Sequence, residues 1–413
     1  MSQSHYDLII YGATSFVGKL LVAHLLHRHG VEGDKSGAGR IRWAIAGRNQ
    51  SKLNQLKLAL REMTIPTVIA DASDRDALDA MVSQTKVVVS TVGPYAIFGS
   101  ELVAACAASG THYCDLTGEA QWIRRMVDTH ESKATETGAK IVHSCGFDSI
   151  PSDLGVWFIQ QQALESFGET CSRVRLLVKN MRGSASGGTV ASALNAIAEQ
   201  SKDPSVALEM ANPYSIAPLD YRHGIKQPQV ITPEFHKASG NWLIPFVMSV
   251  INTRIVHRSH ALLGQPWGKD FRYDEAVMVG SGTLGWLKSA VACGAMASGM
   301  KAMEFSMLRE FAAKQLPQPG EGPSPKEQEQ GCFNILLFGE TASGKTIETQ
   351  VTGDRDPGYG STSKMLGEVA VALAQDMGSS KLKGGFWTPS TLFGDELIDR
   401  LVKHAGLTFV RLN

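Results

Sequence analysis

The sequence predicts an α/β protein that begins with a parallel sheet and continues with a mixed sheet. Six apolar runs in the first third are predicted strands, at residues 8–11, 41–46, 67–70, 87–92, 112–116 and 140–143. Segments with helical apolar spacing separate them, and this alternation implies a parallel sheet with helices on both faces. After about residue 145 the alternation stops, which indicates a second domain of α+β character.

The first strand leads through a tight turn into a helix over residues 16–28, the start of a Rossmann-type dinucleotide-binding fold. Gly12 allows the turn, and Gly18 lets the helix pack closely on the strand. Free N–H groups at the helix start would then face a cofactor pyrophosphate. Ser15 stands where common fingerprints have a glycine, and any glycine-turned βα unit is the alternative interpretation. The cofactor-binding residues predicted on this turn are Gly12, Thr14, Ser15, Phe16, Val17 and Gly18.

The end of the second strand indicates which dinucleotide is bound. An NAD site has a carboxylate there for the ribose hydroxyls, whereas an NADP site has a cation for the 2′-phosphate. This sequence has Arg48 followed by Asn49, and a guanidinium can donate two hydrogen bonds to one phosphate. The sequence therefore predicts NADP(H), with a solvated arginine at a strand end as the alternative.

The next two strand ends complete the predicted cofactor site. Asp71 follows the third strand and either touches the adenine amine or caps a turn. Gly93 and Pro94 follow the fourth strand, whose tip lies under the pyrophosphate and the nicotinamide ribose in this fold.

Composition excludes several classes of protein. The 413 residues have a net charge of zero and no long block of like charge, so a nucleic-acid partner has no electrostatic support. The six cysteines form no Cys-x-x-Cys pair, which argues against a zinc site and against a disulfide framework and suits a reducing cytoplasm. We expect no metal. No signal-peptide pattern is visible, so we expect a cytoplasmic protein, with a location peripheral to the membrane as the alternative if its apolar runs touch lipid.

The second half predicts a mixed sheet with helices. The boundaries we predict are a cofactor domain at 1–147, a substrate domain at 148–360 and a C-terminal helical return at 361–413 that packs near the first domain. Ser152 or Asp153 is expected to cap a helix over 154–163, and residues 204–241 and 316–331 are expected to be irregular. The other predicted elements are strands at 172–179, 333–338 and 346–352, and helices at 190–200, 361–375 and 394–405.

One motif is misleading. Residues 339–346 match the phosphate-loop pattern of ATPases, which must be followed by a helix. Here Ile347, Thr349 and Val351 alternate with polar residues, which is strand periodicity. The glycines are therefore predicted to form a hairpin turn, and no ATP site is expected.

Motifs at residues 12–18, 46–48, 91–95, 113–119, 146–153, 187–189, 356–359 and 384–389 are spread over nearly the whole chain. Together, in this order, they resemble the saccharopine dehydrogenase-like oxidoreductases, and within them the trans-acting enoyl reductases. The resemblance implies NADP-dependent hydride transfer. The enoyl reductase branch resembles a partner of polyketide synthases that reduces an α,β-unsaturated acyl thioester in trans.

For an enoyl thioester, the hydride goes to the β-carbon, the thioester oxygen needs a donor and the α-carbon needs a proton. The predicted catalytic residues are Tyr95, Asp115 and Asp148, near the ends of the fourth to sixth strands. Tyr95 could instead pack on the ribose, Asp115 could cap the next helix like Glu119, and Asp148 could be a turn residue. Two histidines, His112 and His143, are either proton donors or satisfied residues of the sheet edge.

Two apolar runs, 242–256 and 276–300, indicate a lipid-like substrate, although neither is a clean membrane span. They are buried elements, the wall of an acyl tunnel or a surface that dips into lipid. The expected partners are an acyl substrate, free or carrier-bound, a peripheral membrane contact and a second copy in a homodimer. The competing functions are a saccharopine-type amino-acid dehydrogenase and a non-catalytic, lipid-associated scaffold that keeps the cofactor fold.

Overall fold

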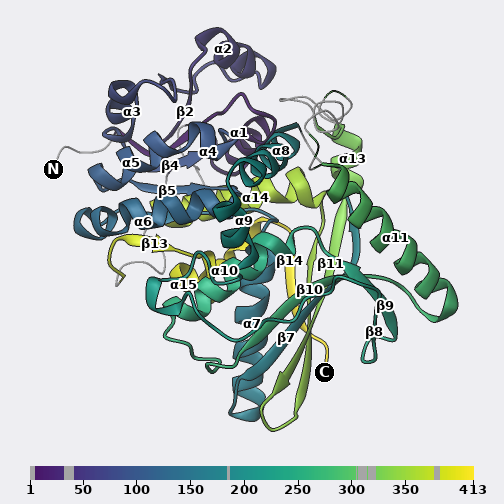
Figure 1. Ribbon diagram of the computed structural model, residues 1–413. Helices are drawn as coiled ribbons and strands as arrows, with labels where there is room; N and C mark the ends of the chain where they lie inside the picture. Colours follow the sequence, from purple (N-terminus) through teal and green to yellow (C-terminus); the bar gives the residue numbers. More distant parts are fainter. Residues whose placement is uncertain are drawn as a thin grey trace.

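The computed structural model contains two seven-stranded sheets with helices around and between them (Figure 1). It describes residues 5–31, 41–183, 187–303, 305, 314, 322–375 and 382–413. The first sheet lies in the upper left of Figure 1, and the long strands of the second sheet lie in the lower right.

The first sheet is parallel throughout and has the order β13-β6-β5-β4-β1-β2-β3. This order confirms the predicted Rossmann-type sheet, and β13 adds a strand from the C-terminal part of the chain. The strands are β1 (Tyr6–Tyr11), β2 (Trp43–Gly47), β3 (Thr67–Ile69), β4 (Thr85–Ser90), β5 (His112–Asp115), β6 (Lys140–Val142) and β13 (Gly385–Trp387).

Both faces of this sheet are covered, because successive residues of its buried strands point to opposite sides. In β1, Leu8 and Ile10 belong to one apolar cluster, with residues of α1 (Phe16–His29) and α14 (Thr362–Ala374). Ile9 and Tyr11 belong to the other cluster. That second cluster also contains residues of α3 (Arg75–Val82), α5 (Ser100–Ser109) and α6 (Ala120–Thr137). The remaining helices of this part are α2 (Gln50–Ala59) and α4 (Tyr95–Phe98).

The second sheet is mixed, as predicted, with the order β14-β12-β11-β7-β10-β9-β8. Only the β7–β10 pair is parallel. Its strands are β7 (Cys171–Arg182), β8 (Glu234–His236), β9 (Asn241–Pro245), β10 (Arg272–Gly280), β11 (Cys332–Thr341), β12 (Thr346–Gly353) and β14 (Leu407–Arg411). The apolar cluster that contains Leu8 continues through α7 (Ile150–Phe167) to Leu337 of β11, so one core joins the two sheets.

The ATPase-like motif is a β-hairpin, as predicted. It joins the antiparallel strands β11 and β12, and Gly344 at its turn has φ +85°. Lys345 forms an ion pair of 3.1 Å with Glu169. No helix follows the motif, so its amides have no phosphate-binding arrangement.

Several local predictions are wrong. Helix α7 begins at Ile150, and Ser152 and Asp153 lie inside its first turn instead of capping it. Asp153 is buried and accepts hydrogen bonds from the Ser259 hydroxyl and the Ser390 amide, so it ties α7 to two other helices. The segment 204–241 is not wholly irregular, since it contains α9 (Pro204–Ala211), a 3-10 turn at Leu219–Tyr221 and β8. The predicted loop 316–331 contains α13 (Pro325–Gln330), and its residues 316–321 lie outside the described residues.

The two apolar runs each divide into a strand and a helix. The first covers β9 and the start of α10 (Ser249–Leu262), and the second covers part of β10 and most of α11 (Gly282–Ala302). Among the helices that the structure describes, none is long and apolar enough to cross a bilayer. The other helix of this half is α8 (Gly187–Lys202).

The C-terminal return contributes one strand to each sheet. Helix α14 lies against β1, β4 and α1, after a short π-helical turn at Pro357–Ser361. Beyond it the chain gives β13 to the first sheet, then α15 (Pro389–Phe393) and α16 (Asp395–His404), and then β14 to the second sheet. The boundaries at 147/148 and 360/361 stay predictions.

Candidate active site

A cavity of about 440 Å³ lies at the carboxyl edge of the first sheet. The start of α1 lines it with Ser15, Phe16 and Val17, and the end of β4 contributes Thr91 and Gly93. A second cavity of about 200 Å³ continues from it toward the second sheet. The two cavities share the lining residues Leu116, Asp148, Val247, Met248 and Tyr359.

The turn that opens the first cavity requires its two glycines. Gly12 has φ +84°, and a Cβ there would lie 2.6 Å from the Val92 side chain. A Cβ on Gly18 would lie 2.3 Å from the Gly12 carbonyl oxygen, because the helix passes directly over the turn. Both contacts are too short for any side chain, so the predicted fingerprint roles of Gly12 and Gly18 agree with the geometry.

Ser15 caps the helix in place of the missing glycine. Its hydroxyl oxygen accepts from the Gly18 amide at 2.9 Å, and its O–H donates to the Thr91 hydroxyl at 2.9 Å. The amides of Phe16 and Val17 find no acceptor in the described part of the chain, and both residues line the cavity. This helix start can therefore receive a phosphate. Thr14, predicted with this group, is half-buried and does not line the cavity.

Arg48, Asn49 and Asp71 lie at the ends of β2 and β3. Arg48 is exposed and forms no ion pair with a described residue. Asn49 caps α2, since its side-chain oxygen accepts from the Lys52 amide at 3.0 Å. Asp71 accepts from the amide and hydroxyl of Ser73, which holds a turn and lowers the pKa of Asp71. Of the three, Arg48 is the one that can receive a 2′-phosphate.

A buried carboxylate holds the loop after β4, which includes Gly93 and Pro94. Glu119 accepts hydrogen bonds from the Tyr95 amide at 2.8 Å, the Ala96 amide at 2.9 Å and the Ser192 hydroxyl at 2.8 Å. Burial raises the pKa of Glu119 in spite of these donors. Glu119 therefore caps α4 and ties the loop to α8. Gly93 lines the cavity, whereas Pro94 does not.

Tyr95 lines the cavity, but its phenol is engaged elsewhere. The hydroxyl donates to the Ser90 carbonyl oxygen at 3.1 Å, and the ring stands 5.5 Å from the Trp122 ring. Burial raises the pKa of Tyr95 well above its ordinary value. The expectation that Tyr95 donates a proton does not fit this geometry, and the residue supports the loop instead.

Asp115 lies beneath the site and does not line either cavity. It is fully buried and accepts from the His143 ring at 2.7 Å, the Tyr113 hydroxyl at 3.0 Å and the amides of Thr117 and Ser144, both at 3.1 Å. This network fixes the ends of β5 and β6. Asp115 therefore supports the ends of these strands, and His143 is one of its hydrogen-bond donors. His112 accepts from the Lys140 amide at 3.1 Å, which places it in the sheet edge.

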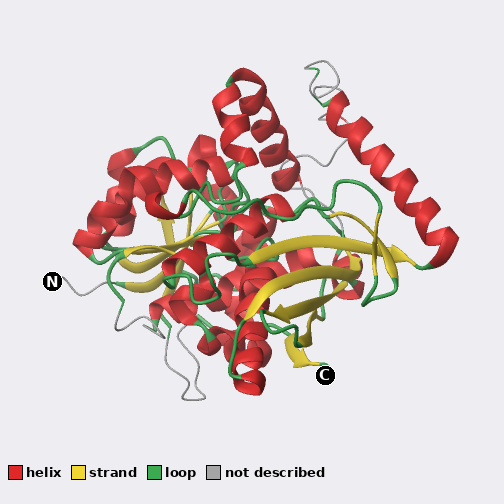
Figure 2. Ribbon diagram, turned by 60° about the horizontal axis from the view of Figure 1, so that its bottom comes forward, coloured by secondary structure: helices red, strands yellow, loops and turns green. Residues whose placement is uncertain are grey.

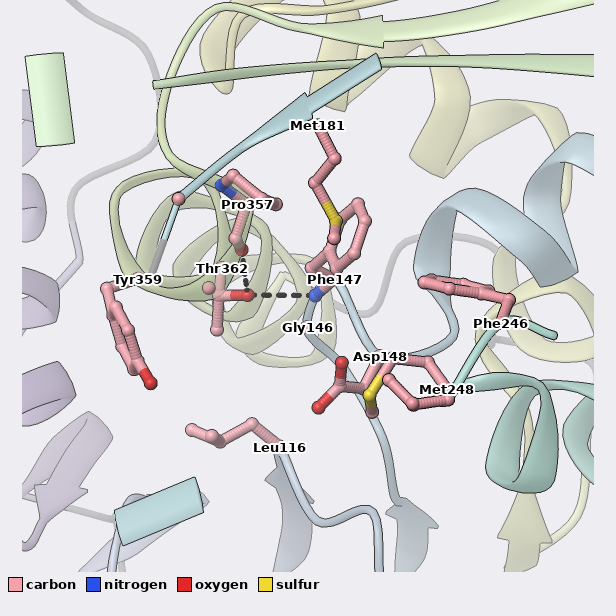
Figure 3. Close-up of a pocket in the computed structure, with 13 residues that line it drawn as sticks. Leu116, Gly146, Phe147, Asp148, Met181, Phe246, Met248, Pro357, Tyr359 and Thr362 are labelled. Atoms are coloured by element: carbon pink, nitrogen blue, oxygen red, sulfur yellow. Dashed lines mark hydrogen bonds between the residues drawn. The ribbon is translucent and has the colours of Figure 1, made fainter. Parts of the chain in front are cut away.

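Asp148 is the predicted catalytic residue that reaches the substrate space. It lines both cavities, and its carboxylate accepts no hydrogen bond from a described residue. Figure 3 shows it pointing into the space between Leu116 and Met248. Burial, and then the charge of Glu275, raise the pKa of Asp148 to about 7. A carboxyl group with this pKa can hold and release a proton near neutral pH.

Tyr359 is a site residue that the sequence predicted only as part of a motif. Its ring meets the Phe16 ring edge-on with centroids 5.1 Å apart, and it lines both cavities (Figure 3). Asp356 fixes it by accepting from the Tyr359 amide at 2.9 Å. A proline and a glycine between an aspartate and a tyrosine predict such a turn, but nothing in the sequence predicts that α1 lies opposite.

The site therefore brings together Gly12, Gly18, the two amides at the start of α1, Gly93 and, at the adjacent strand end, Arg48. This arrangement fits a dinucleotide with a 2′-phosphate. The structure contains no group of three metal-ligating side chains among the residues it describes.

Comparison with known proteins agrees with this fit. The family described as the saccharopine dehydrogenase NADP binding domain matches residues 8–142. A provisionally named trans-acting enoyl reductase of Mycobacterium tuberculosis is 39% identical over 407 residues, 96% of this chain and 95% of its own. The trans-acting enoyl reductase of Mycobacterium bovis is 35% identical over 415 residues, 97% of this chain and 96% of its own.

A solved structure shows the same fold. Apo saccharopine dehydrogenase from Saccharomyces cerevisiae matches with a TM-score of 0.54 at 12% identity, over 99% of this chain and 100% of that chain. The fold and the cofactor site define an NADP-dependent oxidoreductase. Since the full-length relatives are 35% and 39% identical, this chain belongs to the trans-acting enoyl reductase family.

Proposed function

We propose that this NADP-dependent enzyme reduces the carbon–carbon double bond of an α,β-unsaturated acyl thioester. The observation that carries the proposal is the lining of the two joined cavities. Most of it is apolar, including Phe147, Phe246 and Met248. Its lining has two carboxyl groups: Glu119, which accepts three hydrogen bonds, and Asp148, which accepts none from a described residue (Figure 3). Burial raises the pKa of Asp148 to about 7. Names of the full-length relatives point to the same substrate class.

The same lining argues against an amino-dicarboxylate substrate. Carboxylates are usually held by arginine or lysine side chains in paired hydrogen bonds. Among the described residues, neither cavity has an arginine or a lysine in its lining. A saccharopine-type substrate would therefore enter with its carboxylates desolvated and unpaired, at a cost of several kcal/mol.

When bound, NADPH supplies a hydride to the β-carbon of the substrate. The electron pair of the double bond then moves toward the thioester oxygen, and the α-carbon must gain a proton. In our proposal, the Asp148 carboxyl O–H bond breaks and its proton forms the new C–H bond at the α-carbon. The Asp148 carboxylate then takes a proton from water, which restores the acid.

The other residues of the site hold the cavity wall and the start of α1 in place. Glu119 holds the loop of Tyr95 against the cavity, and Ser15 fixes the start of α1. Phe16 and Tyr359 close one side of the cavity with their rings, which limits the access of water to the reacting carbons. Tyr95 and Asp115 remain proposed supports of the site and are not given a proton-transfer role.

The finer partners belong to this proposal as well. We expect the acyl group to arrive on a carrier, because both cavities reach the surface beside Val247, which is 64% exposed. The proposal also includes a peripheral contact of the protein with a membrane, and the assembly of two copies into a homodimer.

The test is NADPH oxidation by the full-length protein with enoyl thioesters of increasing chain length, beside NADP reduction with saccharopine. Asp148→Asn should lower the turnover number at least about a hundredfold, the usual share of a general acid, with NADPH affinity unchanged. Asp399→Asn is the matched control, because Asp399 is an exposed carboxylate on α16. Turnover with saccharopine alone would overturn the proposal, and NADPH binding without any turnover would favour the scaffold.

A further inference from the structure

Helix α11 is attached to the molecule by only one narrow face. The three buried residues of this 21-residue helix are Gly285, Ser289 and Cys293, spaced four apart. Gly285 sits so close to β10 that a Cβ there would lie 2.3 Å from the Gly280 carbonyl oxygen. The helix stands at the outer edge of the molecule in both views (Figures 1 and 2).

The opposite face of α11 is apolar and exposed. Leu284, Leu287 and Val291 follow helical spacing, so their side chains form one stripe. Their exposed fractions are 71%, 53% and 65%. Trp286, on the adjoining side of the helix, is 50% exposed. Isolated exposed apolar residues are ordinary, but a contiguous stripe of this kind marks an interaction surface.

The charges on this helix all have one sign. Residues 276–303 contain no aspartate or glutamate, whereas Lys288 and Lys301 are present and exposed. An apolar stripe with tryptophan and flanking lysines matches an interfacial helix, which buries its apolar side at the headgroup boundary and attracts anionic lipids. The described helices are too short or too polar to cross a bilayer, so the helix would lie on the membrane.

We propose that the outer face of α11 docks the enzyme on the surface of an anionic lipid bilayer. This inference rests on the peripheral contact proposed above, but not on the proposed chemistry.

Strand β9 runs from the attached face of α11 to the substrate cavities. Trp242 at one end of β9 lies beside Gly285 of α11, and Val247, just past the other end, lines both cavities. The five residues of β9 span about 17 Å at roughly 3.3 Å per residue. This strand places the cavity mouth and the helix that carries the docking face in the same part of the molecule.

The experiment measures binding of the full-length protein to phosphatidylcholine vesicles with and without phosphatidylglycerol. Leu284→Glu combined with Leu287→Glu should weaken binding to the anionic vesicles at least about tenfold. Two exposed leucines that the bilayer would bury are then replaced by negative charges, which the anionic surface repels. Leu58→Glu is the matched control, since Leu58 on α2 is 69% exposed, close to the 71% of Leu284. Its binding should equal that of the wild type.

Two further readouts separate the alternatives. Lys288→Glu with Lys301→Glu should abolish the preference for anionic vesicles, and brominated lipid should quench wild-type fluorescence more than that of Trp286→Phe. Turnover of a water-soluble enoyl thioester should stay at the wild-type level in all variants, so failure of docking is distinguishable from failure of the chemistry. Wild-type protein that ignores both vesicle types would overturn the inference. A dimer that only the leucine variant dissociates, without vesicle binding, would assign the face to a second copy and overturn it as well.

Discussion

The preference for NADPH over NADH can be tested at one side chain, Arg48. It is exposed at the end of β2 and forms no ion pair with the residues that the structure describes, so it can receive a 2′-phosphate. Arg48→Asp should remove about 1.5–3 kcal/mol of the preference for NADPH over NADH, the scale of a charge-assisted contact. Titration calorimetry with both cofactors measures this preference, and Lys57→Asp is the charge-matched control at a half-buried lysine of α2. Equal affinities in the wild type would contradict the assignment.

Asp148 should set the pH dependence of the reaction. Its pKa is raised to about 7, so the carboxyl group is protonated below that pH and can act as an acid. The turnover number for reduction should therefore fall as the pH rises through about 7. Glu275→Gln removes the second cause of the raised pKa, and should move this fall to lower pH. An unchanged pH profile in Glu275→Gln would show that burial alone sets the pKa of Asp148.

The raised pKa of Asp148 should also lower the free energy of unfolding at neutral and higher pH. The folded pKa of about 7 lies above the ordinary value of 3.8, so the folded state holds its proton more tightly than the unfolded state. The free energy of unfolding should therefore fall as the pH rises from about 4 to about 7. At pH 8, Asp148→Asn should stabilise the fold by about 1–3 kcal/mol, a range reduced for the contact of Asp148 with solvent. Urea denaturation at pH 5 and pH 8 measures this, and a purely structural aspartate would show destabilisation at both.

At this scale the sequence indicates the positions of the turn glycines and the strand-end arginine better than the surroundings of the predicted proton donors. Glycines of a tight turn and a cation at a strand end are local signals, and Gly12, Gly18 and Arg48 lie where those signals require. The partners that occupy Tyr95 and Asp115 are not local. His143 is 28 residues from Asp115, and no pattern in the sequence shows that their side chains meet.

Among the elements, the β11–β12 hairpin gives the clearest prediction. Lys345→Ala should leave NADPH affinity and turnover unchanged, because Lys345 pairs with Glu169 on the surface and lines neither cavity. Its loss should change the free energy of unfolding by no more than about 1 kcal/mol, as for exposed ion pairs. Binding of a fluorescent ATP analogue to the wild type, lost in Lys345→Ala, would sink the hairpin interpretation.

Two of the strands that were not predicted from the sequence, β13 and β14, share a physical reason. The three residues of β13 pair with β6, and β14 pairs with β12, so both depend on neighbours far away in the chain. Short segments carry little periodicity, and their conformation is decided by tertiary hydrogen bonds. Longer elements such as α6 and β11 contain enough repeats to be predicted, apart from their ends.

For the whole molecule, the joined cavities predict a dependence on chain length. Each CH₂ buried contributes about 0.8 kcal/mol, so kcat/KM should rise with acyl length until the cavities are full. Met181→Trp narrows the far cavity and should shorten the preferred chain, because Met181 lies opposite Phe147 there (Figure 3). Met63→Trp is the control, since Met63 is similarly exposed and lines neither cavity. A flat dependence on chain length in the wild type would contradict the acyl-binding role.

The overall architecture was largely predictable, whereas the way its parts are joined was not. A parallel sheet followed by a mixed sheet follows from the order of strands and helices. That α14 packs on β1 and β4, and that Tyr359 just before it meets Phe16, depends on contacts between residues more than about 270 positions apart. Such contacts leave no periodic signal in the chain.

The chain that supplies β13 to one sheet and β14 to the other has a consequence for biosynthesis. During synthesis, β6 and β12 each have one unpaired edge until residues 385–411 have left the ribosome. Neither sheet has all of its strands before this segment is made. A nascent chain halted before this point would therefore expose two unpaired strand edges to other chains. Emergence of residues 385–411 is thus the event that completes both sheets.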